Sequence, residues 1–123
     1  MNDELVEAID KATVAHALWK ARMIGLLEGE EAKFDRKVAS DPHACEFGKW
    51  LDGNQNLSSS HPEYARIRAN HEAFHTTLGE CLDGIAAGRT EAARKSLAVD
   101  GQFRNLSGRM VLELLHWRDR LTA

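Results

Sequence analysis

The sequence is poor in residues that break helices and poor in cysteine. Two prolines and two cysteines occur in 123 residues. So few prolines, together with abundant Ala, Leu, Glu and Arg, favour helix along most of the chain. Two cysteines in a chain of this composition are more typical of a metal or redox group than of a structural disulfide.

Long apolar runs and a large net charge are also absent. No stretch approaches the roughly 20 apolar residues that a membrane helix needs. The net charge of −3 gives no strong field for recruiting nucleic acid or anionic lipid. Residues 1–4 are acidic, whereas a signal peptide begins basic and continues apolar. We therefore expect a cytoplasmic protein with no membrane or nucleic-acid partner, folded as a single domain over 1–123.

Apolar residues recur at alternating three- and four-residue steps, which is the pattern of helices packed in a bundle. Three long helices are predicted, over about 3–27, 62–87 and 100–121. Two short helices are predicted, over about 41–53 and 90–99. No alternating strand pattern appears. We therefore predict an all-α, four-helix-bundle-like domain with three long and two short helices.

The connections between these helices carry their own signals. Asp41 and Pro42 indicate a helix start, as N-cap and first helical residue, so Cys45 falls in or just after the first turn. Phe34 and Val38 indicate a short irregular or helical cover over the bundle. Residues 54–60 are polar and predict a loop.

The stretch from His71 to His75 reads H-E-x-x-H. Histidines four apart on a helix sit about 40° apart around its axis, so one metal ion can take both. What that metal does depends on its other ligands. His16 lies on the seam of the first long helix. Cys45 lies at a helix start, where the dipole and free amides favour the thiolate that binds metal.

Three interpretations of this pattern remain open at the level of the residues. Three histidines and one thiolate fill a tetrahedral zinc shell and leave no position for a reacting water. Without His16 and Cys45, the pattern describes a zinc hydrolase with Glu72 as general base. A hemerythrin-like di-iron bundle needs several inward carboxylates, which the predicted seams do not carry. Covalent c-type haem is excluded, because Cys-x-x-Cys-His is absent.

The remaining histidines and the second cysteine have ordinary interpretations. His43 and His61 flank the helix-starting prolines, and His116 lies off the seam of its helix. We expect none of them to bind metal. Cys81 lies to one side of the His71 seam, and we expect it to pack in the core.

Three motifs in this order resemble the chemoreceptor zinc-binding (CZB) domain of bacteria. They are His16-x-x-Trp19, Cys45-x-Phe47-Gly48-x-Trp50-Leu51 and His71-x-x-Phe74-His75. The resemblance spans about residues 8–115, and the middle motif is its most specific part. In that family one zinc ion is held by three histidines and one cysteine on three helices. The resemblance therefore implies one Zn²⁺ per chain, and the matching residues are His16, Cys45, His71 and His75.

The resemblance also implies a homodimer and a regulatory role rather than an enzyme. CZB domains are typically attached to chemoreceptor signalling helices or to diguanylate cyclase domains. Members are described as sensing zinc, or oxidants such as hypochlorous acid through the zinc-bound cysteine. No output domain accompanies this chain, so we expect either a stand-alone protein acting on a partner in trans or an excised fragment acting in cis. Trp117 and Leu121, for which a small bundle has few partners, suggest a dimer surface on the long helices.

Two expectations concern the neighbours of the matched ligands. The family often carries an acidic residue before the first histidine, where this chain has Ala15. A carboxylate there could orient His16 by accepting its other ring N–H, so that role must be filled elsewhere or be absent. We also expect Cys45, not Cys81, to respond to oxidants, because a metal-bound cysteine at a helix start has thiolate character. Its short helix can move without breaking the bundle, which makes it a candidate switch element.

Overall fold

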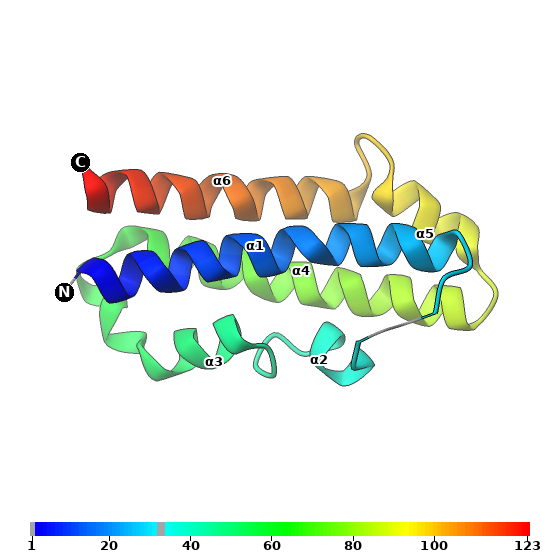
Figure 1. Ribbon diagram of the computed structural model, residues 1–123, viewed down its shortest axis with the longest axis horizontal. Helices are drawn as coiled ribbons and strands as arrows, with labels where there is room; N and C mark the ends of the chain where they lie inside the picture. The colour runs from blue at the N-terminus through cyan, green and yellow to red at the C-terminus, as the bar shows by residue number, and fades with distance from the viewer. Residues whose placement is uncertain (1, 32–33) are drawn as a thin grey trace.

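The computed structural model describes residues 2–31 and 34–123, which fold into a helical bundle (Figure 1). In chain order the elements are α1 (Asn2–Leu27), α2 (Arg36–Ser40), α3 (Glu46–Gly53), the 3₁₀ helix η1 (Gln55–Ser59), α4 (Pro62–Ala86), α5 (Thr90–Leu97) and α6 (Gln102–Thr122). The described residues contain no strand. The predicted all-α bundle, with three long helices and the short helices α3 and α5, is confirmed. The expected short helical cover is the one-turn helix α2, which packs on α4, whereas the expected polar loop contains the 3₁₀ helix η1.

The three long helices run side by side, and the short elements complete the bundle. Figure 1 shows α1, α4 and α6 aligned along the long axis, with α2 and α3 following one another along the fourth corner. The helix α5 lies at one end, and both chain termini lie at the other. Within the described part of the chain, no helix is both long enough and apolar enough to cross a membrane.

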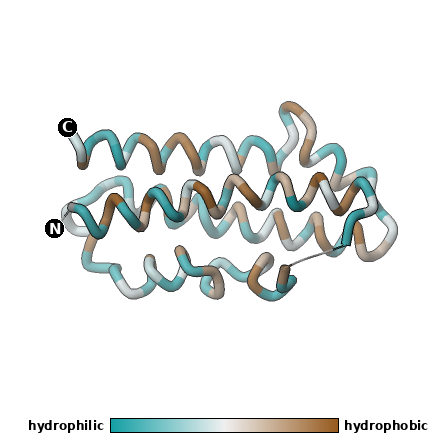
Figure 2. The backbone as a smooth tube through the Cα atoms, viewed as in Figure 1, coloured by the Kyte–Doolittle hydropathy of each residue, from teal (hydrophilic) through white to brown (hydrophobic). Residues whose placement is uncertain are grey.

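The core is built from the apolar seams that the sequence predicts. Apolar and polar segments alternate along each long helix in Figure 2, as expected for helices with one buried face. The largest fully buried apolar side chains are Ile9, Met23, Leu51, Ile67, Phe74, Leu78, Phe103, Met110, Leu114 and Trp117. Because these residues come from α1, α3, α4 and α6, a single core holds the long helices and the Cys45 region together.

The C-terminal end of α6 is tied firmly to the rest of the bundle. Arg118 donates to Asp10 in α1 at 2.7 Å, and Arg120 donates twice to Glu63 at the start of α4. Trp117 has no exposed surface, and its indole N–H donates to Nδ1 of His61 at 3.2 Å. Leu121 is partly buried against the core. The expectation that the bundle offers Trp117 and Leu121 few partners was therefore wrong.

The helix that follows Pro42 starts later than predicted. Asp41 does not cap a helix; its carboxylate accepts the backbone N–H of His43 at 2.9 Å and closes a turn. Cys45 is the N-cap of α3. A Cβ on Gly48 would lie 1.7 Å from the carbonyl oxygen of Pro42, so the turn folds back tightly against α3. This fold-back carries the Cys45 side chain towards the bundle interior.

Candidate metal centre

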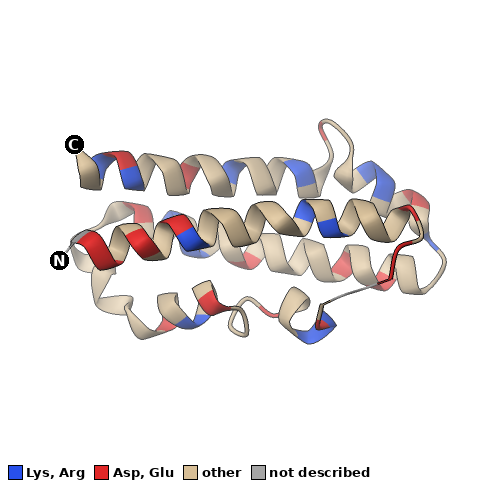
Figure 3. Cartoon of the chain, in the orientation of Figure 1, with Lys and Arg blue, Asp and Glu red and all other residues tan. Residues whose placement is uncertain are grey.

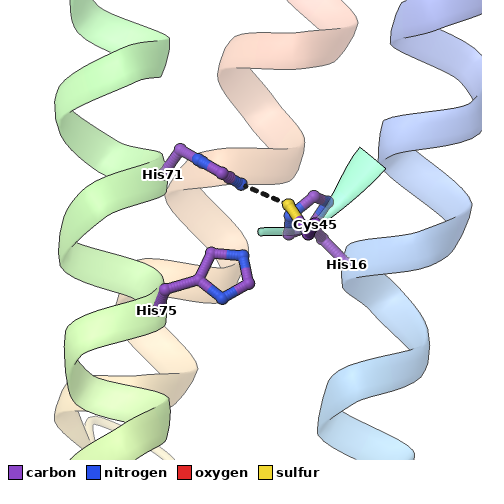
Figure 4. A group of neighbouring side chains, drawn as sticks. All are labelled: His16, Cys45, His71 and His75. Carbon is purple, nitrogen blue, oxygen red and sulfur yellow. Dashed lines mark hydrogen bonds between the residues drawn. The ribbon is translucent and has the colours of Figure 1, made fainter. Parts of the chain in front are cut away.

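Four side chains from three parts of the chain converge inside the bundle (Figure 4). His16 comes from α1, His71 and His75 come from successive turns of α4, and Cys45 comes from the turn before α3. Each offers one ligand atom, and these atoms all lie within 4.8 Å of one another. The closest pair is Sγ of Cys45 and Nε2 of His71, at 3.2 Å. The structure thus brings together all the residues that the sequence suggested as ligands.

Two backbone carbonyls orient two of the imidazole rings. Nδ1 of His16 lies 2.7 Å from the carbonyl oxygen of Ala12, and Nδ1 of His75 lies 2.7 Å from that of Ala39. A carbonyl oxygen can only accept, so Nδ1 carries the proton in both rings and Nε2 offers a lone pair. Both Nε2 atoms are buried and find no hydrogen-bond partner among the described residues. Since buried polar atoms are normally paired, these two nitrogens are free to bind a ligand.

The orienting role that Ala15 cannot fill has passed to the backbone. Ala12 lies one turn before His16 on α1, and Ala39 lies in α2, far from His75 in sequence. Neither residue stood out in the sequence. The Ala12 contact could have been predicted, because Ala12 lies four residues before His16 on the same helix. Nothing in the sequence indicates that the Ala39 carbonyl would contact His75.

Aromatic rings shield the three histidine rings from water. The Phe74 ring packs edge-on at 5.2 Å from the His16 ring and 5.4 Å from the His75 ring, measured between centroids. The Phe47 ring lies 5.3 Å from the His71 ring. His16, His71 and His75 are each at most 2% exposed. Charged forms of these rings are therefore strongly disfavoured.

The environment keeps the three histidines neutral. Burial lowers the pKa of His16 to about 4, against the opposing effect of its bond to the Ala12 carbonyl. Burial, with smaller contributions from His16 and His75, lowers the pKa of His71 to about 2. The pKa of His75 is also lowered by burial. Neutral imidazole is the form that binds metal, so the rings need lose no proton at neutral pH.

Cys45 is less buried than the histidines, and its position only partly matches expectation. As N-cap of α3 it accepts the backbone N–H of Gly48 at 3.3 Å. Burial nevertheless raises the pKa of the Cys45 thiol, and the amides of Gly48 and Phe47 offset this only in part. The N–H groups at the helix start favour the thiolate, as expected, but desolvation by burial is the larger effect. A cation beside Sγ would stabilise the thiolate.

The donor set and its spacing suit zinc. In a tetrahedral zinc shell, bond lengths of about 2.0–2.1 Å to nitrogen and 2.3 Å to sulfur place neighbouring ligand atoms about 3.3–3.7 Å apart. The Cys45–His71 distance of 3.2 Å is close to this, and the outer limit of 4.8 Å requires only small side-chain shifts. Imidazole and thiolate donors favour zinc over calcium or magnesium, which prefer oxygen.

The other histidines lie outside the cluster. Nδ1 of His43 lies 2.8 Å from the Asp52 carboxylate, and Nδ1 of His61 accepts from Trp117. His116 is exposed. Cys81 is buried in the hydrophobic core, as expected.

Carboxylates do not join the cluster. Glu72, the candidate general base, is exposed on the outer side of α4. Two Glu-x-x-His sequences occur, Glu72 to His75 and Glu113 to His116, but Glu113 pairs with Arg66 at 3.3 Å. The carboxylates that a di-iron centre needs are therefore not brought to this site.

Fold and site together define an all-α domain with a buried three-histidine, one-cysteine cluster compatible with zinc. The family model described as "Chemoreceptor zinc-binding domain" matches residues 16–82, which is more than half of the chain and includes all four clustered residues. The chain belongs to the chemoreceptor zinc-binding domain family. Comparisons with curated proteins and with solved structures found no match.

Burial of three neutral histidines makes the metal-free protein sensitive to acid. In the unfolded chain their pKa is near 6.5, whereas in the folded chain it is lowered for all three, to about 4 for His16. The unfolded state therefore binds more protons as the pH falls below about 6.5, and folding stability declines. Each histidine contributes about 1.4 kcal/mol per pH unit, so the slope approaches about 4 kcal/mol per unit. Denaturant unfolding of chelator-treated protein between pH 7.5 and 4.5 measures this slope.

Two variants locate the source of that slope. His71→Leu should remove about one third of it. His116→Gln, at an exposed position, should leave it unchanged. Equal slopes in all three proteins would show that the buried rings are not its cause.

Proposed function

We propose that this protein is a zinc-binding regulatory domain in which His16, Cys45, His71 and His75 together hold one Zn²⁺ per chain. The observation that carries the proposal is the pair of buried Nε2 atoms, on His16 and His75, which have no hydrogen-bond partner among the described residues and face the Cys45–His71 pair. A bound zinc ion would supply a positive charge and four directed bonds at this point. The family match supports the same assignment.

The four residues would close the site rather than leave it open for catalysis. His16 and His75 each present one free nitrogen, and His71 presents Nε2 beside the Cys45 sulfur. Four protein donors complete a tetrahedral shell, and a shell without a water position does not activate water. Glu72 is exposed, so it has no place as a base inside the cluster. These features favour regulation over hydrolysis.

Cys45 is the ligand that we propose responds to oxidants. It is only partly buried, and with His16 it borders a groove of about 800 Å³ between α1 and α3, which Trp19 and Trp50 also line. An uncharged oxidant such as hypochlorous acid can approach the sulfur through this groove. The thiolate then gains the OH group as sulfenic acid, losing two electrons, while chloride leaves. Sulfenic sulfur is a weaker ligand, so zinc is released and α3 is freed.

The output that we propose follows from the family. A chemoreceptor signalling module or a diguanylate cyclase, in cis or in trans, would respond to the change in position of α3 that follows zinc release. A homodimer is part of this proposal, because α1 and α6 carry an unpartnered apolar surface. Val14 and Leu18 on α1 are 62% and 47% exposed, and Leu112 and Leu115 on α6 are 61% and 41% exposed.

The charge along α1 suits an antiparallel pairing with a second copy. Figure 3 shows mainly acidic residues towards its N-terminus, with basic Lys11 next to them, then an uncharged stretch and basic residues further on. Glu4 and Glu7 belong to the acidic part, and Lys20 and Arg22 to the basic part. Around a twofold axis near Val14, the acidic part of one α1 faces the basic part of the other.

Zinc retention separates the regulatory site from a hydrolase. Wild type purified without chelator should carry one zinc ion per chain. His16→Ala should weaken zinc binding on the order of 100-fold or more, because it removes a ligand and opens a coordination position. Glu72→Gln, a matched change at an exposed residue, should leave zinc content unchanged. Dialysis against a mild chelator followed by elemental analysis measures all three.

The same experiment can overturn the ligand assignment. If His16→Ala keeps zinc as well as wild type does, His16 is only a core histidine and an open, hydrolase-like site follows. Iron in place of zinc would favour the di-iron interpretation.

Oxidant response should depend on Cys45. Hypochlorous acid should release zinc from wild type and from Cys81→Ser alike, because Cys81 is buried in the core away from the cluster. Zinc release can be followed with a colorimetric chelator. If Cys81→Ser binds zinc but no longer releases it, Cys81 is the responsive thiol and the assignment is wrong.

Dimerisation should depend on the exposed face of α1. Leu18→Glu removes apolar contact and adds charge at two symmetric places, so we expect the dissociation constant to rise by about 30-fold or more, equivalent to about 2 kcal/mol. Val99→Glu is the control, since Val99 is 74% exposed but lies between α5 and α6. Sedimentation at micromolar concentration distinguishes the outcomes. A monomeric wild type, or a Leu18→Glu protein that dimerises normally, contradicts the proposed interface.

A further inference from the structure

The one-turn helix α2 contacts α4 at three positions spaced four residues apart. At the first, the carbonyl oxygen of Ala39 accepts from Nδ1 of His75 at 2.7 Å. At the third, Arg36 donates to Asp83 at 2.7 Å. Between them lies Gly79, which is buried against Ser40. Since residues four apart share one face of a helix, α2 lies along a single stripe of α4.

The contact between Ala39 and His75 matters for the metal centre. Residues at the end of a helix have carbonyl groups without intrahelical partners, and the buried Ala39 uses its own for the His75 ring. This bond holds the proton on Nδ1 and leaves the lone pair of Nε2 facing the other clustered side chains. His16 takes its equivalent bond from its own helix, through Ala12. The His75 bond instead depends on the distance between two helices.

Gly79 sets that distance. A Cβ added to Gly79 would lie 2.9 Å from Cβ of Ser40, and real Cβ atoms do not approach other atoms so closely. Ser40 follows Ala39 directly in α2, and its Cβ is fixed to the backbone, so only a movement of α2 away from α4 could relieve the overlap. Such a movement would lengthen the bond from Ala39 to His75.

We propose that Gly79 is a positioning residue for the metal centre. It keeps α2 close enough to α4 for the Ala39 carbonyl to hold the His75 ring with Nε2 free. The inference rests on the proposed zinc-binding function, and it assigns a role to α2, which contributes no ligand.

The test is a Gly79→Ala substitution with a compensating change at Ser40. Gly79→Ala should weaken zinc binding on the order of 10-fold, the usual effect of disturbing a group that orients a ligand. Ser40→Gly removes the Cβ that the new methyl group meets, so the double variant should recover most of the lost affinity. The single variant Ser40→Gly completes the double-mutant cycle. Gly108→Ala in α6 is the matched control, because a Cβ there has nothing within 4 Å.

A second readout does not involve zinc. In metal-free protein at neutral pH, ¹⁵N chemical shifts of the His75 ring should report the proton on Nδ1 in wild type. Gly79→Ala should populate the form with the proton on Nε2, and the double variant should restore the wild-type pattern. Circular dichroism checks that each variant is folded. If Gly79→Ala alone does not fold, the double variant still tests the inference.

The outcomes separate this inference from the proposed function. If wild type binds no zinc, the proposed function fails, while the ring tautomer still tests the role of Gly79. If wild type binds zinc and Gly79→Ala binds it equally well, only the inference fails. A loss of affinity that Ser40→Gly does not reverse also overturns it, because spacing between α2 and α4 is then not the cause.

Discussion

The structure depends on placing three imidazole rings and one thiol inside an apolar core. Desolvation is the largest influence on the pKa of each of the four groups. It keeps the rings neutral and protonates the sulfur, so the cluster carries no charge of its own at neutral pH. Yet two ring nitrogens have no hydrogen-bond partner among the described residues, which is costly in a low-dielectric interior. A cation that takes these lone pairs turns a source of instability into a link between α1, α3 and α4.

The H-E-x-x-H pattern occurs both in metal sites with a free position for water and in sites whose positions are all filled by protein. The difference depends on residues outside the motif. The spacing of His71 and His75 shows only that both rings can face one ion. Whether a water position remains is decided by residues far away in sequence, His16 and Cys45. Their approach depends on the packing of α1 and on the turn before α3. Glu72 lies on the exposed side of α4, away from the buried cluster.

Much of the fold and the cluster could be predicted from periodicity and residue type, whereas its supporting contacts could not. The seams of α1, α4 and α6 carry a clear helical period, and His16 and His71 lie on them. The start of α3 was misplaced, because a Pro after an Asp signals a helix start equally well when it makes a turn. Gly48 allows the turn, because only a residue without a side chain leaves room for the Pro42 carbonyl against α3. The role of the Ala39 carbonyl could not be predicted, because every residue has a carbonyl and only tertiary packing brings this one to His75.

The break between α2 and α3 frees backbone groups that a single long helix along this side of the bundle would use internally. A continuous helix from Arg36 to Gly53 would use its own carbonyl and N–H groups in internal hydrogen bonds. The break at Asp41 and Pro42 creates two ends instead. The end of α2 leaves the Ala39 carbonyl free for His75, and the start of α3 leaves N–H groups free for the Cys45 sulfur. One break in the chain therefore supplies an acceptor for the His75 ring and a donor for the Cys45 sulfur. It also places Cys45 on a short segment of its own, apart from the three long helices.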